Sequence, residues 1–291
     1  ALALRCPLII SPAMDADMWL HPATKKNITF LRETGSVILP PEEGELASGL
    51  TGPGRLPENQ SIINAINATL SVSSKDLKGK KILITAGPTR EAIDPVRYIG
   101  NRSSGKMGFA LANAAALRGA DVTLVAGPVN LQTPRNVQRI DVESADQMYR
   151  SVMKQSNGKH AIIMAAAVAD FTPKNVSSTK IKKEKLGSSD VSVELKKTKD
   201  ILRDLSLGKN HGKLIGFSLE TNNELQNAKK KLKEKKLDYI ILNNPLKDGA
   251  AFGSDTNIIT IISRAGKIEK LKKMSKFEAA NQILNRVAKI L

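Results

Sequence analysis

One stretch near the middle of the chain limits most strongly what the chain can fold into. Lys81–Ala86 (KILITA) is a short apolar run typical of a buried strand, and Asp121–Ala126 (DVTLVA) is a second one. Between them, the alanine-rich segment Gly105–Arg118 predicts a helix that ends at Gly119. A strand, a helix and another strand in this order favour a parallel sheet with helices on both faces.

The alternation continues toward the C-terminus, so we predict an α/β fold with a mostly parallel sheet. Further strands are expected at Val137–Val142, His160–Ala166, Lys213–Phe217 and Tyr239–Leu242, with helices near Asp146–Gln155, Asp200–Leu207 and Glu224–Lys236. A hairpin is expected from Asn257–Ile262 and Lys267–Leu271, followed by a terminal amphipathic helix, Lys276–Leu291. Phe171–Lys197 is polar and lysine-rich, and it is expected to leave the sheet.

Residues 1–70 read as a separate, smaller unit. Short strands are expected at Cys6–Ser11 and Val37–Leu39, helices at His21–Thr34 and Ser61–Leu70, and a loop at Glu42–Pro57. The polar segment 71–78 is the expected linker, which leaves 79–291 as the main domain. Because the chain opens at Ala1 and reads at once as a buried strand, we expect the first domain to lack its N-terminal part.

Charge and cysteine content narrow the classes of function. Lys and Arg number 45 against 28 Asp and Glu, a formal charge of +17, which implies anionic partners. Cys6 is the sole cysteine, so no intrachain disulfide is possible and a reducing compartment is expected. No apolar run approaches the roughly 20 residues that span a bilayer. We expect a cytoplasmic protein without a membrane partner.

The segment from Gly87 to Gly108 (GPTREAIDPVRYIGNRSSGKMG) is the richest in site-like features. It joins a strand to a helix N-terminus, where an α/β sheet binds phosphate. It contains no G-x-G-x-x-G, and although Gly100–Lys106 matches G-x-x-x-x-G-K, Met107 replaces the Ser or Thr that a P-loop needs. The alternative is an ordinary glycine-rich connection, but loops longer than about 12–15 residues are usually functional or disordered.

Three other segments are weaker signals. The small residues of Met164–Asp170 (MAAAVAD) permit close approach of a ligand, or simply tight helix packing with a solvated aspartate. Taken alone, the lysine runs Lys180–Lys183, followed by Lys185, and Lys229–Lys236 read as solvated faces. The three histidines have no metal-ligand spacing, so no side-chain metal site is predicted.

Together these segments resemble the phosphopantothenate–cysteine ligase family, as the C-terminal half of bacterial bifunctional coenzyme A biosynthesis proteins. The motifs ITAGPTREAIDPVRYIGNRSSGKMG, AAVADF, KIKK and GFSLET, and a final lysine-bearing helix, occur in family order over about residues 79–291. The resemblance implies a Rossmann-like ligase domain preceded by a truncated, flavodoxin-like segment. The family works as a homodimer, and a higher oligomer is possible with a complete decarboxylase domain.

The preceding residues resemble the end of the family's flavin-dependent phosphopantothenoylcysteine decarboxylase domain. Pro12–Trp19 (PAMDADMW) is similar to P-x-M-N-x-x-M-W, with Asp15 in place of Asn. Gly44–Leu56 (GELASGLTGPGRL) is similar to the substrate-clamp loop, with Ser48 in place of the catalytic cysteine. Since a hydroxyl is a far weaker acid than a thiol, decarboxylation is not expected of this chain, and FMN is expected only with the complete domain.

The resemblance implies a two-step ligation with Mg²⁺ as the metal. The carboxylate of 4′-phosphopantothenate attacks the α-phosphate of CTP, and the amine of L-cysteine then displaces CMP from the acyl-cytidylate. Asn101 would be catalytic and bind phosphopantothenate with Ser103, Ser104 and Gly105. Lys180 would support the first step. CTP would contact Met164, Ala165, Ala166, Asp170, Lys180, Lys199, Asp200, Ile201, Leu202, Phe217, Lys231 and Lys235.

Two other classes of function compete with the ligase. An NAD(P)-dependent oxidoreductase would share the fold, but the fingerprint is missing and Val122–Ala126 leads into Gly127-Pro128 instead of an acidic residue. A basic nucleic-acid-binding module would fit the charge. Aromatic residues make up only 3% of the chain, which leaves few platforms for base stacking, so no specific nucleic-acid partner is expected.

Overall fold

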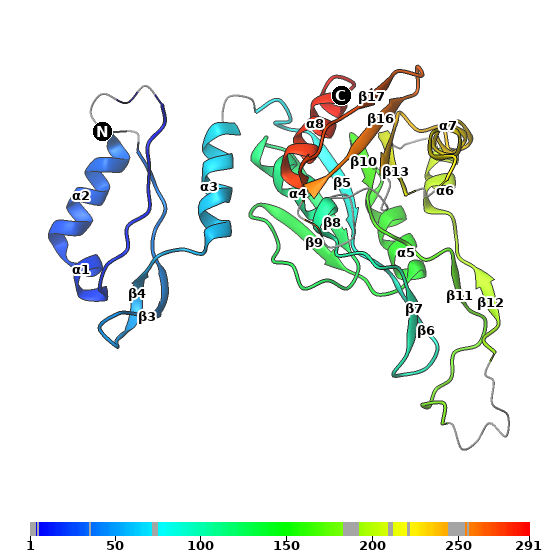
Figure 1. Ribbon diagram of the computed structural model, residues 1–291, viewed down its shortest axis with the longest axis horizontal. Coiled ribbons are helices and arrows are strands. Elements are labelled where there is room, and N and C mark those ends of the chain that lie inside the picture. Colours follow the sequence, from blue (N-terminus) through cyan, green and yellow to red (C-terminus); the bar gives the residue numbers. More distant parts are fainter. Residues whose placement is uncertain are drawn as a thin grey trace. The chain divides into compact units, whose positions relative to one another are not determined.

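The computed structural model describes residues 4, 6–34, 36–71, 75–182, 192–208, 212–219, 222–243, 254 and 256–291. The chain forms two compact units, Ala1–Lys75 and Asp76–Leu291 (Figure 1). Of the residues assigned to the linker, 72–74 lie outside the described part. By their contacts, residues 76–78 belong to the second unit, because Leu77 is fully buried in its core and Asp76 pairs with Arg118.

The first unit consists of short elements. They are β1 (Ile9–Ile10), α1 (Ala16–Leu20), α2 (Pro22–Glu33), β2 (Val37–Ile38), β3 (Glu42–Glu45), β4 (Thr51–Arg55) and α3 (Asn59–Ser71). β1 pairs with β2 in parallel, and β3 pairs with β4 as a hairpin. The expected loop at Glu42–Pro57 was therefore wrong. Strands β3 and β4 are rich in glycine and charged residues and show no apolar alternation, so no strand signal was present in the sequence. The turn between them contains Gly49, whose φ of 81° favours glycine.

The second unit contains an eight-stranded sheet in the order β17-β16-β14-β13-β10-β5-β8-β9. Its strands are β5 (Lys81–Ala86), β8 (Asp121–Ala126), β9 (Val137–Asp141), β10 (Ala161–Met164), β13 (Lys213–Leu219), β14 (Tyr239–Asn243), β16 (Ile259–Ser263) and β17 (Ile268–Lys270). The first six are parallel and the last two antiparallel. If the six parallel strands are numbered in chain order, their order across the sheet is 3-2-1-4-5-6. This is a doubly wound arrangement, so the predicted α/β class is confirmed.

Helices cover both faces of this sheet. α4 (Lys106–Leu117) and α8 (Lys276–Ala288) pack on one face, against side chains such as Ile82 and Ile84 of β5. α5 (Ala145–Gln155), α6 (Ile201–Leu207) and α7 (Glu224–Glu234) contribute to the core on the other face, which receives Leu83. Strand residues alternate between faces, so successive apolar residues of β5 enter two different cores.

Three small ribbons stand outside the large sheet. β6 (Arg90–Ala92) pairs with β7 (Tyr98–Gly100), β11 (Phe171–Pro173) with β12 (Leu195–Lys197), and β15 (Thr256–Asn257) with β18 (Met274–Ser275). The first two project beyond the sheet (Figure 1). The described part of Phe171–Lys197 therefore leaves the sheet as expected, whereas the hairpin β6–β7 inside the glycine-rich segment was not predicted.

The described residues contain no helix that is both long enough and apolar enough to cross a membrane.

Candidate active site

The parallel strand order reverses between β5 and β10, and two loops leave the sheet there at their carboxyl ends. Such a switch point is where open α/β sheets bind ligands. The loops are joined by hydrogen bonds. The N–H of Ala167 donates to the carbonyl of Gly87 at 2.9 Å, and the N–H of Ala169 donates to the Thr89 hydroxyl at 3.0 Å. The glycine-rich segment is thus fixed against the small residues after β10.

Asn101 adds a further link between these loops. Its side-chain Nδ2 donates to the carbonyls of Ala167 and Val168, both at 3.1 Å. The residue remains exposed and lines a cavity of about 490 Å³. The other lining residues are Pro88, Thr89, Arg90, Tyr98, Gly100, Arg102, Ser103, Ser104 and Pro128. Asn101, Ser103 and Ser104, three of the predicted phosphopantothenate ligands, therefore share one cavity.

The N-terminus of α4 follows at once. Gly105 is its N-cap with φ of 74°, and its N–H donates to the Ser103 hydroxyl at 3.3 Å. A Cβ on Gly108 would lie 2.5 Å from the Cβ of Ala86, so only glycine lets the helix approach β5 this closely. The unpaired N–H groups of a helix N-terminus stabilise a phosphate or carboxylate, and this one begins beside the Asn101 cavity.

The small residues after β10 have different exposures. Met164 is buried and accepts a weak hydrogen bond from the Thr85 hydroxyl at 3.8 Å, while Ala165 and Ala166 are half-buried. The N–H of Ala166 is already bound to the same hydroxyl, at 3.1 Å. Asp170 is exposed, which agrees with the alternative of a solvated aspartate.

Two lysines, Lys231 of helix α7 and its C-cap residue Lys235, approach strand β13 and the N-terminus of α6. Lys231 donates to the carbonyl of Phe217 at 2.9 Å, and Lys235 donates to both carboxylate oxygens of Asp200, at 3.0 and 2.8 Å. Burial is the largest influence and acts to raise the pKa of Asp200, but the hydrogen bonds from Lys235 and the N–H of Arg203, together with the charges of Lys235 and Lys231, lower the pKa overall. Lys231, Lys235, Asp200 and Phe217 are therefore brought together.

The remaining predicted CTP contacts differ in accessibility, from buried Ile201 and Leu202 to exposed Lys199. Ile201 and Leu202 are 4% and 8% exposed, so a ligand could reach them only through their backbone. Phe217 is half-buried and packs against the core. Lys199 pairs with Asp146 at 3.3 Å and lies over the Tyr149 ring.

Lys180 is exposed in the segment that follows β11 and lines neither this cavity nor the larger one described next. The structure therefore does not bring Lys180 together with Asn101 within this chain. Lys183 and Lys185 of the same lysine run lie outside the described residues.

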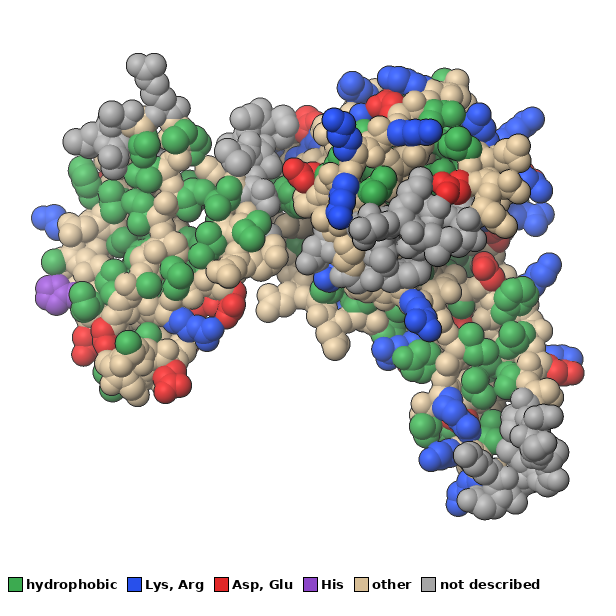
Figure 2. Space-filling view, viewed as in Figure 1, with side chains coloured by type: hydrophobic (Ala, Val, Ile, Leu, Met, Phe, Trp, Pro, Cys, Tyr) green, Lys and Arg blue, Asp and Glu red, His purple; other side chains and the backbone are tan. Residues whose placement is uncertain are grey.

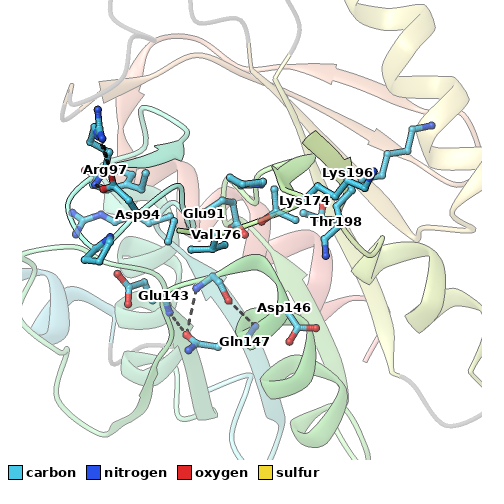
Figure 3. Close-up of a pocket in the computed structure, with 18 of the residues that line it drawn as sticks. Glu91, Asp94, Arg97, Glu143, Asp146, Gln147, Lys174, Val176, Lys196 and Thr198 are labelled. Carbon is cyan, nitrogen blue, oxygen red and sulfur yellow. Dashed lines mark hydrogen bonds and ion pairs between the residues drawn. The ribbon is translucent and has the colours of Figure 1, made fainter. Parts of the chain in front are cut away.

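A larger cavity, about 740 Å³, lies between the β6–β7 hairpin, the start of α5 and the β11–β12 ribbon (Figure 3). Sequence reasoning missed it, although the charged residues of Arg90–Arg97 were a usable signal. Glu91 is 3% exposed and accepts from the N–H of Ala145 at 2.8 Å, at the beginning of α5. Arg90 lines both cavities and lies 4.7 Å from the centre of the Tyr98 ring.

The two positions of interest in the first unit have contrasting environments. Asp15 occupies the N-cap position of α1 without a side-chain capping bond. Its buried Oδ1 has no hydrogen-bond partner, and neither has the buried hydroxyl of Ser11. Ser48 is exposed at the turn of the β3–β4 hairpin. The N–H of Met14 donates to the carbonyl of Gly54 at 3.0 Å, which places the hairpin beside α1.

No group of three or more His, Cys, Asp or Glu side chains among the described residues could hold a metal ion.

Comparison with protein families matches both units. The model described as "DNA/pantothenate metabolism flavoprotein C-terminal domain" matches residues 77–291, and the model described as "Flavoprotein" matches residues 1–71.

Two of the similar proteins carry different names. The Coenzyme A biosynthesis bifunctional protein CoaBC of Bacillus subtilis strain 168 is 44% identical, over 99% of this chain and 70% of that protein. A protein named Cysteine/Cysteine sulfinic acid decarboxylase, from an unknown prokaryotic organism, is 46% identical over 98% of this chain and 80% of its own length.

Solved structures agree on the fold of the second unit. A crystal structure of the C-terminal domain of a CoaBC protein has a TM-score of 0.64 and 40% identity, covering 74% of this chain and 97% of that one. The DNA/pantothenate metabolism flavoprotein of Streptococcus pneumoniae has a TM-score of 0.60 at 23% identity, covering 72% of this chain and 98% of that one, and is similar in fold alone.

Proposed function

This chain belongs to the family of the DNA/pantothenate metabolism flavoprotein C-terminal domain, and we propose that its second unit is a CTP-dependent phosphopantothenate–cysteine ligase. Its relatives include bifunctional proteins of coenzyme A biosynthesis at 42–44% identity. The observation that carries the proposal is the junction at Asn101. There the loops after β5 and β10 meet beside a helix N-terminus and an open cavity.

The proposed reaction has two steps. In the first, a carboxylate oxygen of 4′-phosphopantothenate forms a bond to the α-phosphorus of CTP and pyrophosphate leaves. In the second, the amine of L-cysteine attacks the acyl carbon, CMP leaves, and the nitrogen loses a proton. Both steps depend on holding anionic groups together, so positioning and electrostatic stabilisation account for most of the catalysis.

The residues around the junction suit these tasks. Ser103, Ser104 and the Gly105 helix start offer donors to phosphopantothenate, and the Asn101 amide would orient the acyl group. CTP would lie along Met164–Ala166 toward Asp170 and Lys199–Leu202. Lys231 and Lys235 would exchange their present acceptors for phosphate oxygens and Phe217 would lie near the base. Lys180 would neutralise charge in the first step.

In the proposed reaction, Mg²⁺ would enter the site bound to the nucleotide. This ion keeps several waters and is usually bound by substrate phosphates with one or two carboxylates, so it needs no cage of protein side chains. Asp170, which is exposed beside the proposed CTP site, would contact its water shell.

Pyrophosphate release is the first test. We expect release from CTP and Mg²⁺ that depends on 4′-phosphopantothenate, followed by CMP and the phosphopantothenoylcysteine amide when L-cysteine is added. ATP and UTP in parallel reactions test the choice of base. Absence of release with every nucleotide would reject the proposed function.

Asn101→Asp tests the role of the junction. A carboxylate cannot donate to the carbonyls of Ala167 and Val168, so we expect CTP to bind normally while turnover of the acyl-cytidylate falls about a hundredfold. Asn281→Asp is the matched control, because Asn281 also donates from Nδ2 to a carbonyl, that of Phe277, on the distant helix α8. Equal ligation by the two variants would refute the role of Asn101.

We also propose a homodimer through the projecting ribbons. Large apolar side chains are exposed along β6–β7 and the β11–β12 region, namely Val96, Tyr98, Phe171, Val176, Val193 and Leu195. Figure 2 shows hydrophobic side chains gathered over this projecting part. An apolar surface of this kind favours a protein partner. Phe171→Asp should shift the mass in solution from dimer to monomer, and an unchanged mass would exclude this surface.

Flavin-dependent decarboxylation is proposed only for a chain with a complete flavoprotein domain, where FMN would bind. The residues present here do not supply the proton donor that this chemistry needs, because Ser48 carries an exposed hydroxyl. No step of the proposed ligation passes through a flavin.

A further inference from the structure

Asp94 is a buried carboxylate at the turn of the β6–β7 hairpin. Its side chain is fully buried, and Oδ1 accepts from the N–H groups of Val96 and Arg97, both at 2.8 Å. Oδ2 accepts from Arg97 Nε at 3.0 Å and Nη2 at 2.5 Å (Figure 3). A bidentate pair of this kind is strongly directional. The turn is therefore held in one shape by its own carboxylate.

The same pair binds a second segment of the chain. Asp94 Oδ2 accepts from the N–H of Ile181 at 3.1 Å, and Arg97 Nη2 donates to the carbonyl of Ile181 at 2.8 Å. Both backbone polar groups of Ile181 are thus held by residues more than eighty positions earlier in the chain. We call this arrangement the Asp94 clamp.

A second contact anchors the same segment slightly upstream. The N–H of Ser177 donates to the carbonyl of Ile93 at 3.0 Å, and the Ser177 hydroxyl donates to the carbonyl of Thr179 at 2.6 Å. Lys180 lies between the two anchors, next to Ile181, with its side chain exposed. The backbone of Lys180 is fixed on both sides while its ammonium group remains available.

The clamp is also connected to Asn101. β6 and β7 pair in register, with Glu91 opposite Ile99 and Arg90 opposite Gly100, so the turn at Asp94 and the residue after β7 belong to one hairpin. Asn101 follows that hairpin directly. A single ribbon therefore contacts the backbone beside Lys180 and leads directly into Asn101.

The charge on Asp94 does not vary over the usual working range of pH. The hydrogen bond from Arg97 holds the pKa of this carboxyl well below its ordinary value, with further help from the N–H groups of Val96 and Ile181, although burial acts in the opposite direction. The clamp is consequently a permanent anchor of the segment.

We infer that Asp94 is a positioning residue for the ligase, which holds the backbone of Lys180 through Ile181 in a fixed relation to the hairpin that carries Asn101. The inference rests on the proposed ligase function and adds a residue that contacts neither nucleotide nor acyl group. It acts through the geometry of Lys180. Its removal should therefore affect the first chemical step more than nucleotide binding.

Asp94→Asn in the full chain tests this inference. The amide would present a donor where Oδ2 now accepts, so Ile181 loses its acceptor. We expect pyrophosphate release to slow about a hundredfold, with the Kd for CTP within about twofold of wild type. Asp76→Asn is the matched control. Asp76 makes a similar bidentate contact with Arg118, at 2.9 and 2.5 Å, but this contact lies just before β5 and not in the β6–β7 turn.

Amide hydrogen exchange supplies a readout that does not depend on activity. In Asp94→Asn, the peptide containing Ile181 should exchange at least about tenfold faster than in wild type, and in Asp76→Asn it should not change. Unchanged exchange in Asp94→Asn, or equal pyrophosphate release by the two variants, would overturn the inference.

If wild type releases no pyrophosphate, the ligase proposal fails, while the exchange result still tests the clamp. If Asp94→Asn does not fold, exchange in wild type decides, because an unprotected Ile181 amide would contradict the clamp.

Discussion

The two units of the chain differ in how completely their elements are covered. In the second unit, helices cover both faces of the sheet and the side chains of Leu83, Ile84 and Ile162 are fully buried. In the described part of the first unit, the buried hydrophobic side chains are those of Trp19 and Ile28. Its Met18, Phe30 and Leu50 are more than half exposed. The described part of the first unit therefore buries far fewer apolar side chains than the second unit does.

Separating the units should have the largest effect. We expect residues 76–291 alone to unfold cooperatively on heating, because both apolar faces of their sheet are covered. Residues 1–75 alone should show a weaker and broader transition by circular dichroism. A sharp transition in 1–75 would break the comparison.

Removing a core side chain from each unit should sharpen the contrast. Leu83→Ala is expected to lower the free energy of unfolding by about 3 kcal/mol, because Leu83 is surrounded by close-packed neighbours. Ile28→Ala should cost less than about 1.5 kcal/mol, since its surroundings can relax toward solvent. Urea unfolding measures both. The sole tryptophan, Trp19, reports on the first unit by fluorescence, while circular dichroism reports mainly on the second. Equal costs would contradict the contrast.

Breaking an ion pair should also destabilise the second unit more than the first. Asp76→Asn leaves Arg118, whose side chain is 5% exposed, without its anion and should cost about 1.5 kcal/mol at about pH 7. Glu58→Gln breaks an exposed pair with Arg55 and should cost less than about 0.5 kcal/mol.

The pH dependence follows from the direction of the pKa shift at Asp76. Its hydrogen bond with Arg118 lowers the pKa of the folded carboxyl below the value of about 3.9 in the unfolded chain. The stabilisation is therefore complete above that unfolded value and is lost as pH falls through the lower, folded value. The difference between wild type and Asp76→Asn should shrink below about pH 4. If the stability difference between wild type and Asp76→Asn grew in acid, the Asp76 carboxylate would not be the source of the stabilisation.

Helix caps should give the smallest effect. Ser275 and Glu278 form a capping box at the start of α8, so Ser275→Ala should cost about 1 kcal/mol. His21 caps α2 in the first unit through one hydrogen bond of 3.2 Å from the N–H of Ala23, and His21→Ala should cost less. Thermal unfolding of the two variants compares them, and a larger loss for His21→Ala would count against the contrast.

Much of the second unit could be predicted because its signals are local. The apolar runs at Lys81–Ala86 and Asp121–Ala126 are strands in the structure with the same bounds. Segments buried on both faces are apolar throughout, and glycine ends the intervening helix, so neither signal depends on distant residues. The hairpin β3–β4 was missed because its two strands pair with each other and show no alternation of apolar residues.

Some residues of the candidate site could likewise be predicted from the sequence, and others could not. Its motif residues Asn101, Ser103 and Ser104 were recognisable from the sequence, since they adjoin a helix start after a strand. The clamp on Ile181 was not, because it joins residues far apart in the chain. Accessibility was also decided by packing, which leaves Asp170 exposed and buries Ile201.

The sequence was enough to predict the order of the strands and helices of the large sheet, the excess of positive charge and the family of the second unit. Only the tertiary structure decided which carbonyls receive the Asn101 amide, which carboxylates pair with lysine, and where Asp94 anchors the Lys180 segment. Secondary structure follows from periodicity within a few neighbouring residues. Contacts between loops depend instead on where the sheet brings the ends of separate strands, and no local pattern encodes that.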